Sequence, residues 1–388
     1  MLKGNKGEWS EMYVLLKLLA EGKLVAANAE LEKIENVFYP IIKILREEKD
    51  SKREFVVGEK IDIIDGNDGK LIVSFEIEEF IERSIQLFHL LKKSKGSSTS
   101  FPDIEDFLRK IEVTTLKAGS KEKADIRIKV HDLNTGQKPT LGFSIKSMLG
   151  KDSTLFNPGA GTNFIFKVLP KNDQRIDVAK FNADTYAMPV ESEHNTSKKK
   201  SKILTRLEAL ENFGFEIRFA KVQSPTLEMN LQLIDSQLPI IISRLLYYKF
   251  RTGKSKLKEV VEKVKDENPL GFNLTNNHPF YEYKVKNFLT EVALGMTPEK
   301  VWTGKYDATG GIIIVKENGD VVCYHIYNRN EFQEYLLNNT KLEQASTGED
   351  EHNPGSAKEA DSKKYRYGWL YEEDGQLFFK LNLQIRFT

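Results

Sequence analysis

The most constraining feature of this chain is residues 124–149, ADIRIKVHDLNTGQKPTLGFSIKSML, in which apolar and polar side chains alternate on both sides of a turn. The apolar residues of 126–130 fall on one face, because successive side chains of a strand point to opposite faces. Asn134 and Gly136 supply turn chemistry, and the apolar residues of 141–145 repeat the alternation. The pattern predicts a β-hairpin.

Polar groups gather at one end of this hairpin. Asp125 stands at its start, and Ser144 and Lys146 lie on the same side of the return strand. An acid and a lysine on neighbouring strands favour a site for a hard cation, although a hydroxyl is a weaker Mg²⁺ ligand than a carboxylate. A second negative charge must therefore come from elsewhere in the chain. The alternative is that these are solvated charges on an amphipathic hairpin.

The N-terminal segment offers that second charge. Apolar side chains recur at helical spacing and predict an amphipathic helix over 8–21 that ends at Gly22. Glu8 and Glu11 lie one turn apart at the edge of the apolar face. Either glutamate could supply the carboxylate, and Asp152 is the reserve candidate. The alternative role for either glutamate is to favour the helix macrodipole.

The arrangement of Asp125, Ser144 and Lys146 resembles the skeleton of the PD-(D/E)xK nucleases, with serine in place of their second acid. The predicted N-terminal helix, in which Glu11 lies eleven residues ahead of a helix-ending glycine, resembles a helix of Holliday-junction resolvases and related enzymes. The resemblance implies that Asp125 and Glu11 hold Mg²⁺ and that Lys146 orients the attacking water or stabilises the transition state.

Composition sets limits on the class of protein. The 388 residues carry 58 basic and 57 acidic side chains, so any nucleic-acid surface must be a local concentration of charge. The single cysteine, Cys323, excludes an intramolecular disulfide and a cysteine-cluster zinc site. No signal peptide or membrane-spanning run is apparent, and we expect a cytoplasmic protein.

The rest of the chain mixes helical and β patterns. Residues 30–50 and 75–95 are interpreted as helices, and 228–251 as a strongly apolar helix. A hairpin is predicted around Asn318-Gly319, and residues 345–364 are interpreted as a disordered insertion.

These patterns predict an α/β fold in which helices flank a mixed central sheet, plus an α+β C-terminal portion. The resemblance to the PD-(D/E)xK nucleases implies a PD-(D/E)xK restriction-endonuclease-like core. We expect a nuclease core over 1–170, containing helix 8–21 and hairpin 124–149. Residues 171–388 are expected to contribute DNA binding and dimerisation.

Five strings in order resemble the HpaII family of type II restriction endonucleases: GNKGEWSEMYVLLKLLAEGKL, GFSIKSMLGKDSTLFNPGAGTNF, FYEYKVKNFLTEVALGMTP, GKYDATGGIIIVKENGDVVCYHIYNRNEF and KLNLQIRF. The resemblance spans nearly the whole chain, and the insertion at 345–364 departs from it. It implies Mg²⁺-dependent cleavage of double-stranded DNA at a short palindrome, CCGG. A homodimer matches a palindromic site, and a cognate cytosine methyltransferase encoded nearby would complete a restriction–modification system.

The residues that contact DNA are harder to place. The glycine-containing loop after the catalytic strand carries Asn157, Thr162 and Asn163, whose side chains could approach a base edge. Turn stabilisation is the alternative role for the asparagines. A basic tract could contact phosphates or be a solvated surface, and its residues are Lys198, Lys199, Lys200 and Lys202.

Other functions remain open at this point. The missing acid at Ser144 would suit a catalytically silent DNA-binding protein. A structure-specific repair nuclease would cut branched or mismatched DNA regardless of sequence. His325 and Asn328 invite comparison with a metal-finger nuclease, but the further histidines of such a site are absent from the sequence.

Overall fold

The computed structural model of the chain describes residues 1–49, 51–96, 98–117, 124–150, 152–172, 174–187, 202–345 and 367–388. Its contacts divide the chain into two compact units. Unit 1 comprises Met1–Ser153, Ala293–Gly295 and Lys305–Tyr335. Unit 2 comprises Thr154–Val292, Met296–Gly304 and Leu336–Thr388.

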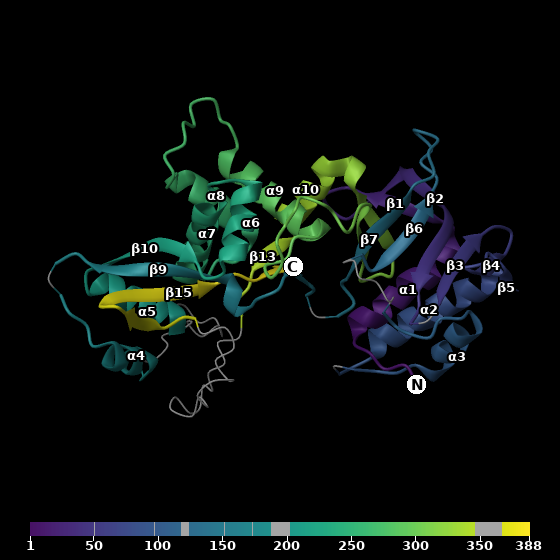
Figure 1. Cartoon of the computed structure of the whole chain (residues 1–388), viewed down its shortest axis with the longest axis horizontal. Coiled ribbons are helices and arrows are strands. Elements are labelled where there is room, and N and C mark those ends of the chain that lie inside the picture. Colours follow the sequence, from purple (N-terminus) through teal and green to yellow (C-terminus); the bar gives the residue numbers. More distant parts are fainter. Residues whose placement is uncertain are drawn as a thin grey trace. The chain divides into compact units, whose positions relative to one another are not determined.

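Unit 1 combines a large mixed sheet with helices (Figure 1). Its helices are α1 (Lys6–Glu21), α2 (Ile77–Lys93) and α3 (Pro102–Lys110), and α10 (Arg329–Asn338) spans the division between the units. Its strands are β1 (Lys23–Ala27), β2 (Lys33–Glu47), β3 (Lys52–Val57), β4 (Ile61–Asp65), β5 (Leu71–Phe75), β6 (Ile126–Val130), β7 (Thr140–Ser147), β11 (Gly311–Val315) and β12 (Val321–His325). The mixed α/β class predicted from the sequence is confirmed.

The strand order in unit 1 is β1-β12-β11-β7-β6-β2-β3-β4-β5. Strand β7 runs parallel to β11 and antiparallel to β6. Strand β1 also pairs with β2, so that β1, β12, β11, β7, β6 and β2 close into a ring of strands. No local pattern in the sequence indicates this closure, because it depends on the pairing of Ala26 with Cys323, which are far apart in the chain.

The predicted hairpin is confirmed as β6 and β7, with Ile126 opposite Phe143 and Ile128 opposite Leu141. The carboxylate of Asp132 accepts hydrogen bonds from the backbone of Asn134 and from the Thr135 hydroxyl at 2.9 and 2.7 Å, which closes the turn. The apolar face of β6 joins the main core of unit 1. The opposite face of this end of the hairpin is thereby available for polar groups.

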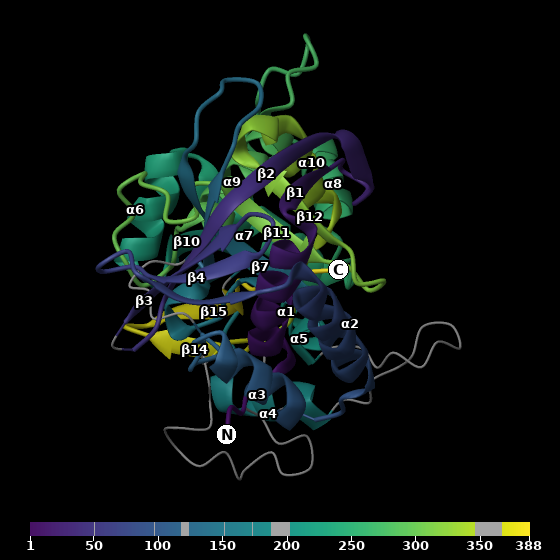
Figure 2. The same cartoon turned by 90° about the vertical axis from the view of Figure 1, so that its right-hand side faces the viewer.

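Helix α1 is the central helix of that core. The Asn5 side chain caps its first turn in a capping box with Glu8, and Gly22 ends it in the left-handed region at φ 65°. Trp9, Met12 and Leu16 are fully buried. The helix lies beside α2 and also contacts β7, β1 and β2 (Figure 2). Its burial from several sides fixes the position of every polar residue that it carries.

The predicted helix over 30–50 is wrong, because residues Lys33–Glu47 form strand β2. This segment is rich in β-branched and aromatic residues, and Pro40 in its middle cannot donate the hydrogen bond that a helix interior needs. The helix expected over 75–95 is confirmed as α2.

Unit 2 combines helices with two smaller antiparallel sheets, of orders β10-β9-β15-β14 and β13-β16-β8. Its helices are α4 (Val178–Ala187), α5 (Lys202–Asn212), α6 (Pro225–Ile234), α7 (Leu238–Thr252), α8 (Leu257–Glu267) and most of α9 (Phe280–Leu294). Its strands are β8 (Thr154–Phe156), β9 (Asn163–Pro170), β10 (Phe215–Val222), β13 (Thr340–Leu342), β14 (Leu370–Glu373), β15 (Gln376–Asn382) and β16 (Ile385–Phe387). Helices α5 and α7 both pack on β10.

The division expected at residue 170 assigns β11 and β12 to the C-terminal portion, whereas their contacts lie in unit 1. The roles expected for residues 171–388 stay predictions. Of the insertion expected at 345–364, residues 346–364 lie outside the described part. Within the described residues, no helix combines the length and the apolar character needed to cross a membrane.

We predict that Asn5→Ala lowers the free energy of unfolding by about 1 kcal/mol, because the backbone N–H of Glu8 loses its acceptor. Urea unfolding followed by circular dichroism measures the change. Asn5→Asp keeps a side-chain acceptor, so its free energy of unfolding should stay close to that of the wild type. An equal loss in both variants would show that the cap does not stabilise α1.

Candidate active site

Asp125 stands at a bend immediately before β6, and its backbone N–H donates to the carbonyl of Phe143 on β7 at 2.9 Å. Its carboxylate oxygen Oδ2 accepts a hydrogen bond from the Ser144 hydroxyl at 3.0 Å and from the backbone N–H of Ile145 at 2.6 Å. Ser144 is buried, with 3% of its surface exposed. The serine that replaces the expected second acid therefore orients Asp125 by donating to it. No described residue donates to the other oxygen of Asp125 in a hydrogen bond.

Two contacts hold α1 against the end of β7. The buried Ser10 hydroxyl hydrogen-bonds the hydroxyl of Ser147 at 2.8 Å, and the ammonium of Lys6 donates to the carbonyl of Leu149 at 3.1 Å. Ser10 and Ser147 are the sequence neighbours of Glu11 and Lys146. The packing of α1 thus determines where the Glu11 carboxylate lies relative to the hairpin.

The structure separates the two glutamates of α1. Glu8 completes the capping box and forms an ion pair with Lys117 at 3.3 Å, so it has a structural role. Glu11 lines a small cavity together with Asp125, and no hydrogen bond or ion pair reaches its carboxylate from the described residues. The geometry therefore favours Glu11 over Glu8 as the second acid.

The cavity shared by Glu11 and Asp125 has a volume of about 10 Å³, which is roughly the room for one ion or water molecule. Leu15, Ile44 and Ile126 provide apolar walls, and Leu45 and Arg46 complete the lining. Burial and then the negative charge of Asp125 raise the pKa of Glu11 to about 8, while Lys117 and Arg46 act in the opposite direction. Two carboxylates so placed repel each other until a cation or a proton intervenes.

The donor set fits a hard divalent cation. Mg²⁺ is commonly held by one or two carboxylates and completes its coordination with water and phosphate oxygens. Among the described residues no group of three or more histidine, cysteine or acidic side chains is close enough to hold a metal, so a site built on Glu11 and Asp125 has two carboxylates. Asp152 is exposed and does not line the cavity.

Lys146 follows Ser144 on the same side of β7 and is half-buried. Its ammonium makes no hydrogen bond or ion pair with any described residue. The cations that act on Glu11 are instead Lys117 and Arg46. The structure therefore brings Glu11, Asp125 and Ser144 together. Lys146 is related to them only by its position on the same side of β7 as Ser144.

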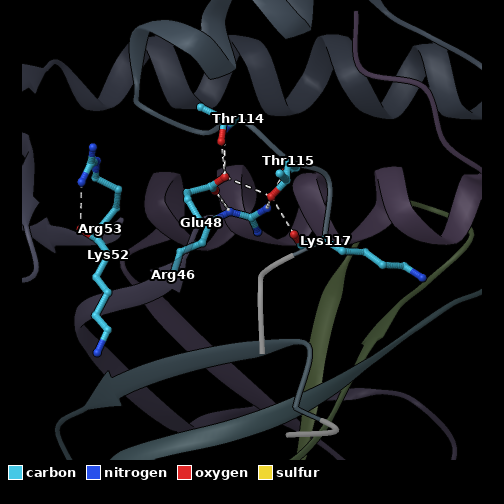
Figure 3. Close-up of polar contacts among 7 residues, drawn as sticks. All are labelled: Arg46, Glu48, Lys52, Arg53, Thr114, Thr115 and Lys117. Atoms are coloured by element: carbon cyan, nitrogen blue, oxygen red, sulfur yellow. Dashed lines mark hydrogen bonds and ion pairs between the residues drawn. The ribbon is translucent and has the colours of Figure 1, made fainter. Parts of the chain in front are cut away.

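A buried ion pair that was not among the residues expected from the sequence lies beside this cavity. Arg46 and Glu48 are 6% exposed, and Arg46 Nε donates to Glu48 Oε1 at 2.5 Å. Figure 3 shows the Glu48 carboxylate facing Arg46 and the hydroxyls of Thr114 and Thr115. Alternation from Ile44 onward would have placed both charges at inward positions of a strand, but the helical interpretation of 30–50 concealed this signal.

The three loop residues expected to contact DNA lie in unit 2 and differ in exposure. Asn157 is exposed, in the loop after β8. Thr162 and Asn163 are fully buried, and the Asn382 amide donates to both side chains, at 3.1 and 2.7 Å. These bonds support turn stabilisation, and base reading by Thr162 and Asn163 finds no support in this geometry.

Of the basic tract, Lys198, Lys199 and Lys200 lie outside the described residues. Lys202 begins α5, where its ammonium donates to the carbonyl of Tyr186 and lies 5.3 Å from the centre of that ring. A phosphate contact by these lysines stays a prediction.

His325 and Cys323 lie on β12 and are buried. Burial lowers the pKa of His325 to about 4, so its imidazole is neutral at pH 7. The ring stacks on Tyr39 with centroids 4.6 Å apart, and its Nδ1 accepts from the Tyr327 N–H. Burial also raises the pKa of the Cys323 thiol. Neither residue has the environment of a nucleophile.

Comparison with known proteins gives two matches. A family model described as HpaII restriction endonuclease matches residues 5–387. The chain is 39% identical over 392 residues to the type II restriction enzyme HpaII of Haemophilus parainfluenzae, an alignment that covers 99% of this chain and 98% of that protein. No solved structure matches the chain.

We predict that metal-free stability falls as the pH rises from about 4.5 to about 8, because the folded state retains a proton on Glu11 that the unfolded state releases in this window. Above the window both states are ionised, and the cost of burying the charge is complete. Urea midpoints measured in EDTA across this range should fall less steeply in Glu11→Gln. Equal slopes for the two proteins would contradict the raised pKa.

Proposed function

Since the chain belongs to the HpaII restriction endonuclease family, we propose that it makes Mg²⁺-dependent double-strand breaks at a short palindromic DNA site, CCGG. The family membership confirms the type II restriction endonuclease predicted from the sequence. The metal, the site sequence and the residue roles are the further content of the proposal. The observation that carries it is the meeting of Glu11 and Asp125 at a cavity with room for one ion.

In this proposal Asp125 and Glu11 hold the cation, with the backbone carbonyl after Ser144 as a neutral ligand. When bound, Mg²⁺ supplies positive charge to the phosphate as negative charge develops on it. Ser144 and the Ile145 N–H keep Asp125 oriented through their hydrogen bonds to Oδ2. The apolar walls of the cavity limit the access of water, which strengthens these electrostatic interactions.

Lys146 has a different role. Its ammonium has no partner among the described residues, and it lies two residues beyond Ser144 on the strand face that carries the serine. We assign Lys146 the role of orienting the attacking water and helping that water to lose a proton. The nuclease core of the PD-(D/E)xK type is part of this proposal, with β6, β7 and α1 as the elements that carry the site.

The palindromic target argues for a homodimer, because two identical subunits related by a two-fold axis would place one site on each strand. Residues 171–388 would contribute to DNA binding and dimerisation. The enzyme would act in the cytoplasm beside a cytosine methyltransferase that protects host CCGG sites. Analytical ultracentrifugation with and without a CCGG duplex tests the dimer.

We predict that purified protein with Mg²⁺ cuts unmethylated plasmid DNA into discrete fragments that map to CCGG. Lys146→Ala and Asp125→Asn should each lower the single-turnover rate by at least about 10²-fold, because each removes a charge that acts where charge develops. Lys129→Ala is the matched control, since Lys129 is a half-buried lysine on the neighbouring strand β6.

The other outcomes discriminate among functions. Discrete fragments that map to another sequence would support the mechanism and contradict CCGG as the recognition site. Retained DNA binding without any cleavage would support a catalytically silent binding protein. Cleavage confined to branched or mismatched DNA would indicate a structure-specific repair nuclease.

A further inference from the structure

Arg46 is the one cation that lines the cavity of Glu11 and Asp125 among the residues the structure describes. It occupies an inward position of β2, two residues after the fully buried Ile44. A buried guanidinium is costly to keep unless it is paired and hydrogen-bonded. The partners of this guanidinium, and the donors that they leave unused, therefore decide what it can do beside two carboxylates.

The guanidinium is anchored along one edge. Its Nε donates to Glu48 Oε1 at 2.5 Å, and its Nη2 donates to the carbonyl of Thr115. The remaining amino group, Nη1, makes no hydrogen bond to any described residue. One edge of the group is therefore fixed, and two N–H donors remain for another acceptor.

Glu48 is itself held firmly. Its second oxygen, Oε2, accepts from the backbone N–H of Thr114 at 3.1 Å and from the hydroxyls of Thr114 and Thr115 at 2.6 and 3.0 Å. Burial opposes the ionisation of Glu48, yet Arg46 and these hydroxyls hold its pKa below the usual range. A carboxylate so fixed gives Arg46 little freedom to turn elsewhere.

Arg53 provides a contrast within the same sheet. It is the direct cross-strand partner of Arg46, with a side chain that is 13% exposed and forms ion pairs with Asp65 and Glu112, both at 3.2 Å. It does not line the cavity, and Figure 3 shows it apart from the Arg46–Glu48 pair. Two neighbouring arginines that both pair with carboxylates therefore differ in whether they adjoin the acidic site.

We propose that Arg46 is a further residue of the active site, which donates from Nη1 to an oxygen of the scissile phosphate, and that Glu48 is the residue that positions it. This inference rests on the proposed cleavage reaction. Arginine suits the task because its planar guanidinium stays charged and can bind a carboxylate with one edge and a phosphate oxygen with another. Phosphodiester hydrolysis places additional negative charge on that oxygen in the transition state.

The test compares Arg46→Gln, Glu48→Gln, the double variant Arg46→Gln/Glu48→Gln and the control Arg53→Gln. The double variant removes both buried charges, so it remains informative where Arg46→Gln alone fails to fold with Glu48 unpaired. Each variant is first checked for folding by circular dichroism and thermal unfolding. Binding to a CCGG duplex is then measured by fluorescence anisotropy with Ca²⁺, between about 50 and 200 mM salt.

Loss of one phosphate contact should reduce the slope of log binding constant against log salt by about one in Arg46→Gln and in the double variant. Single-turnover cleavage with Mg²⁺ should fall by at least about 10²-fold in both. Glu48→Gln keeps the arginine and should retain the salt slope with a smaller loss of rate. Arg53→Gln should match the wild type in both measurements.

A folded double variant with the wild-type slope and rate would overturn the inference, as would equal losses in Arg53→Gln. Failure of the proposed function would give a different result. Wild-type protein would then cut no DNA, but the salt dependence of DNA binding would still show whether Arg46 contacts a phosphate. A changed slope in the Arg46 variants with no wild-type cleavage would therefore keep the contact and discard the reaction.

Discussion

The contact between α1 and the end of β7 is the interaction on which the proposed active site depends. Burial of α1 supplies the driving force, and the hydrogen bond between Ser10 and Ser147 aligns the helix with the strand. This alignment places Glu11 at the cavity that Asp125 also lines. Two half-buried carboxylates in one small cavity are unfavourable by themselves, and in the proposed site a divalent cation would relieve this electrostatic cost.

In the proposed site the second carboxylate comes from helix α1 and not from strand β7. A carboxylate at position 144 would have put a third negative group beside Asp125 and Glu11, which would increase their mutual repulsion. The Ser144 hydroxyl instead donates a hydrogen bond to Asp125 and leaves the second charge to α1. The departure from the usual two-acid strand is therefore consistent with an active enzyme of this family.

A ring of strands places β7 between β6 and β11, so the hairpin cannot shift without disturbing strands from both ends of the chain. Strand β2 belongs to the same ring and carries Arg46 to the cavity. The acidic pair and the buried arginine are thus positioned by one sheet and the helix packed on it. This common support explains how residues from three distant segments could act on one phosphate.

Local patterns in the sequence determined the hairpin, the α1 helix and the resemblance to the family, because alternation, capping and turn residues act over a few neighbours. Asp125, Ser144 and Lys146 could be singled out for the same reason, and Glu11 was a choice between two helix positions. The tertiary structure gives these two positions different surroundings, because Glu8 lies in the capping box and Glu11 is half-buried at the cavity that Asp125 also lines. The tertiary structure also decided the closure of the sheet, since pairing between distant strands leaves no short-range signal. It decided the placement of Arg46 as well, because the segment that carries Arg46 forms strand β2 and not the helix expected from the sequence.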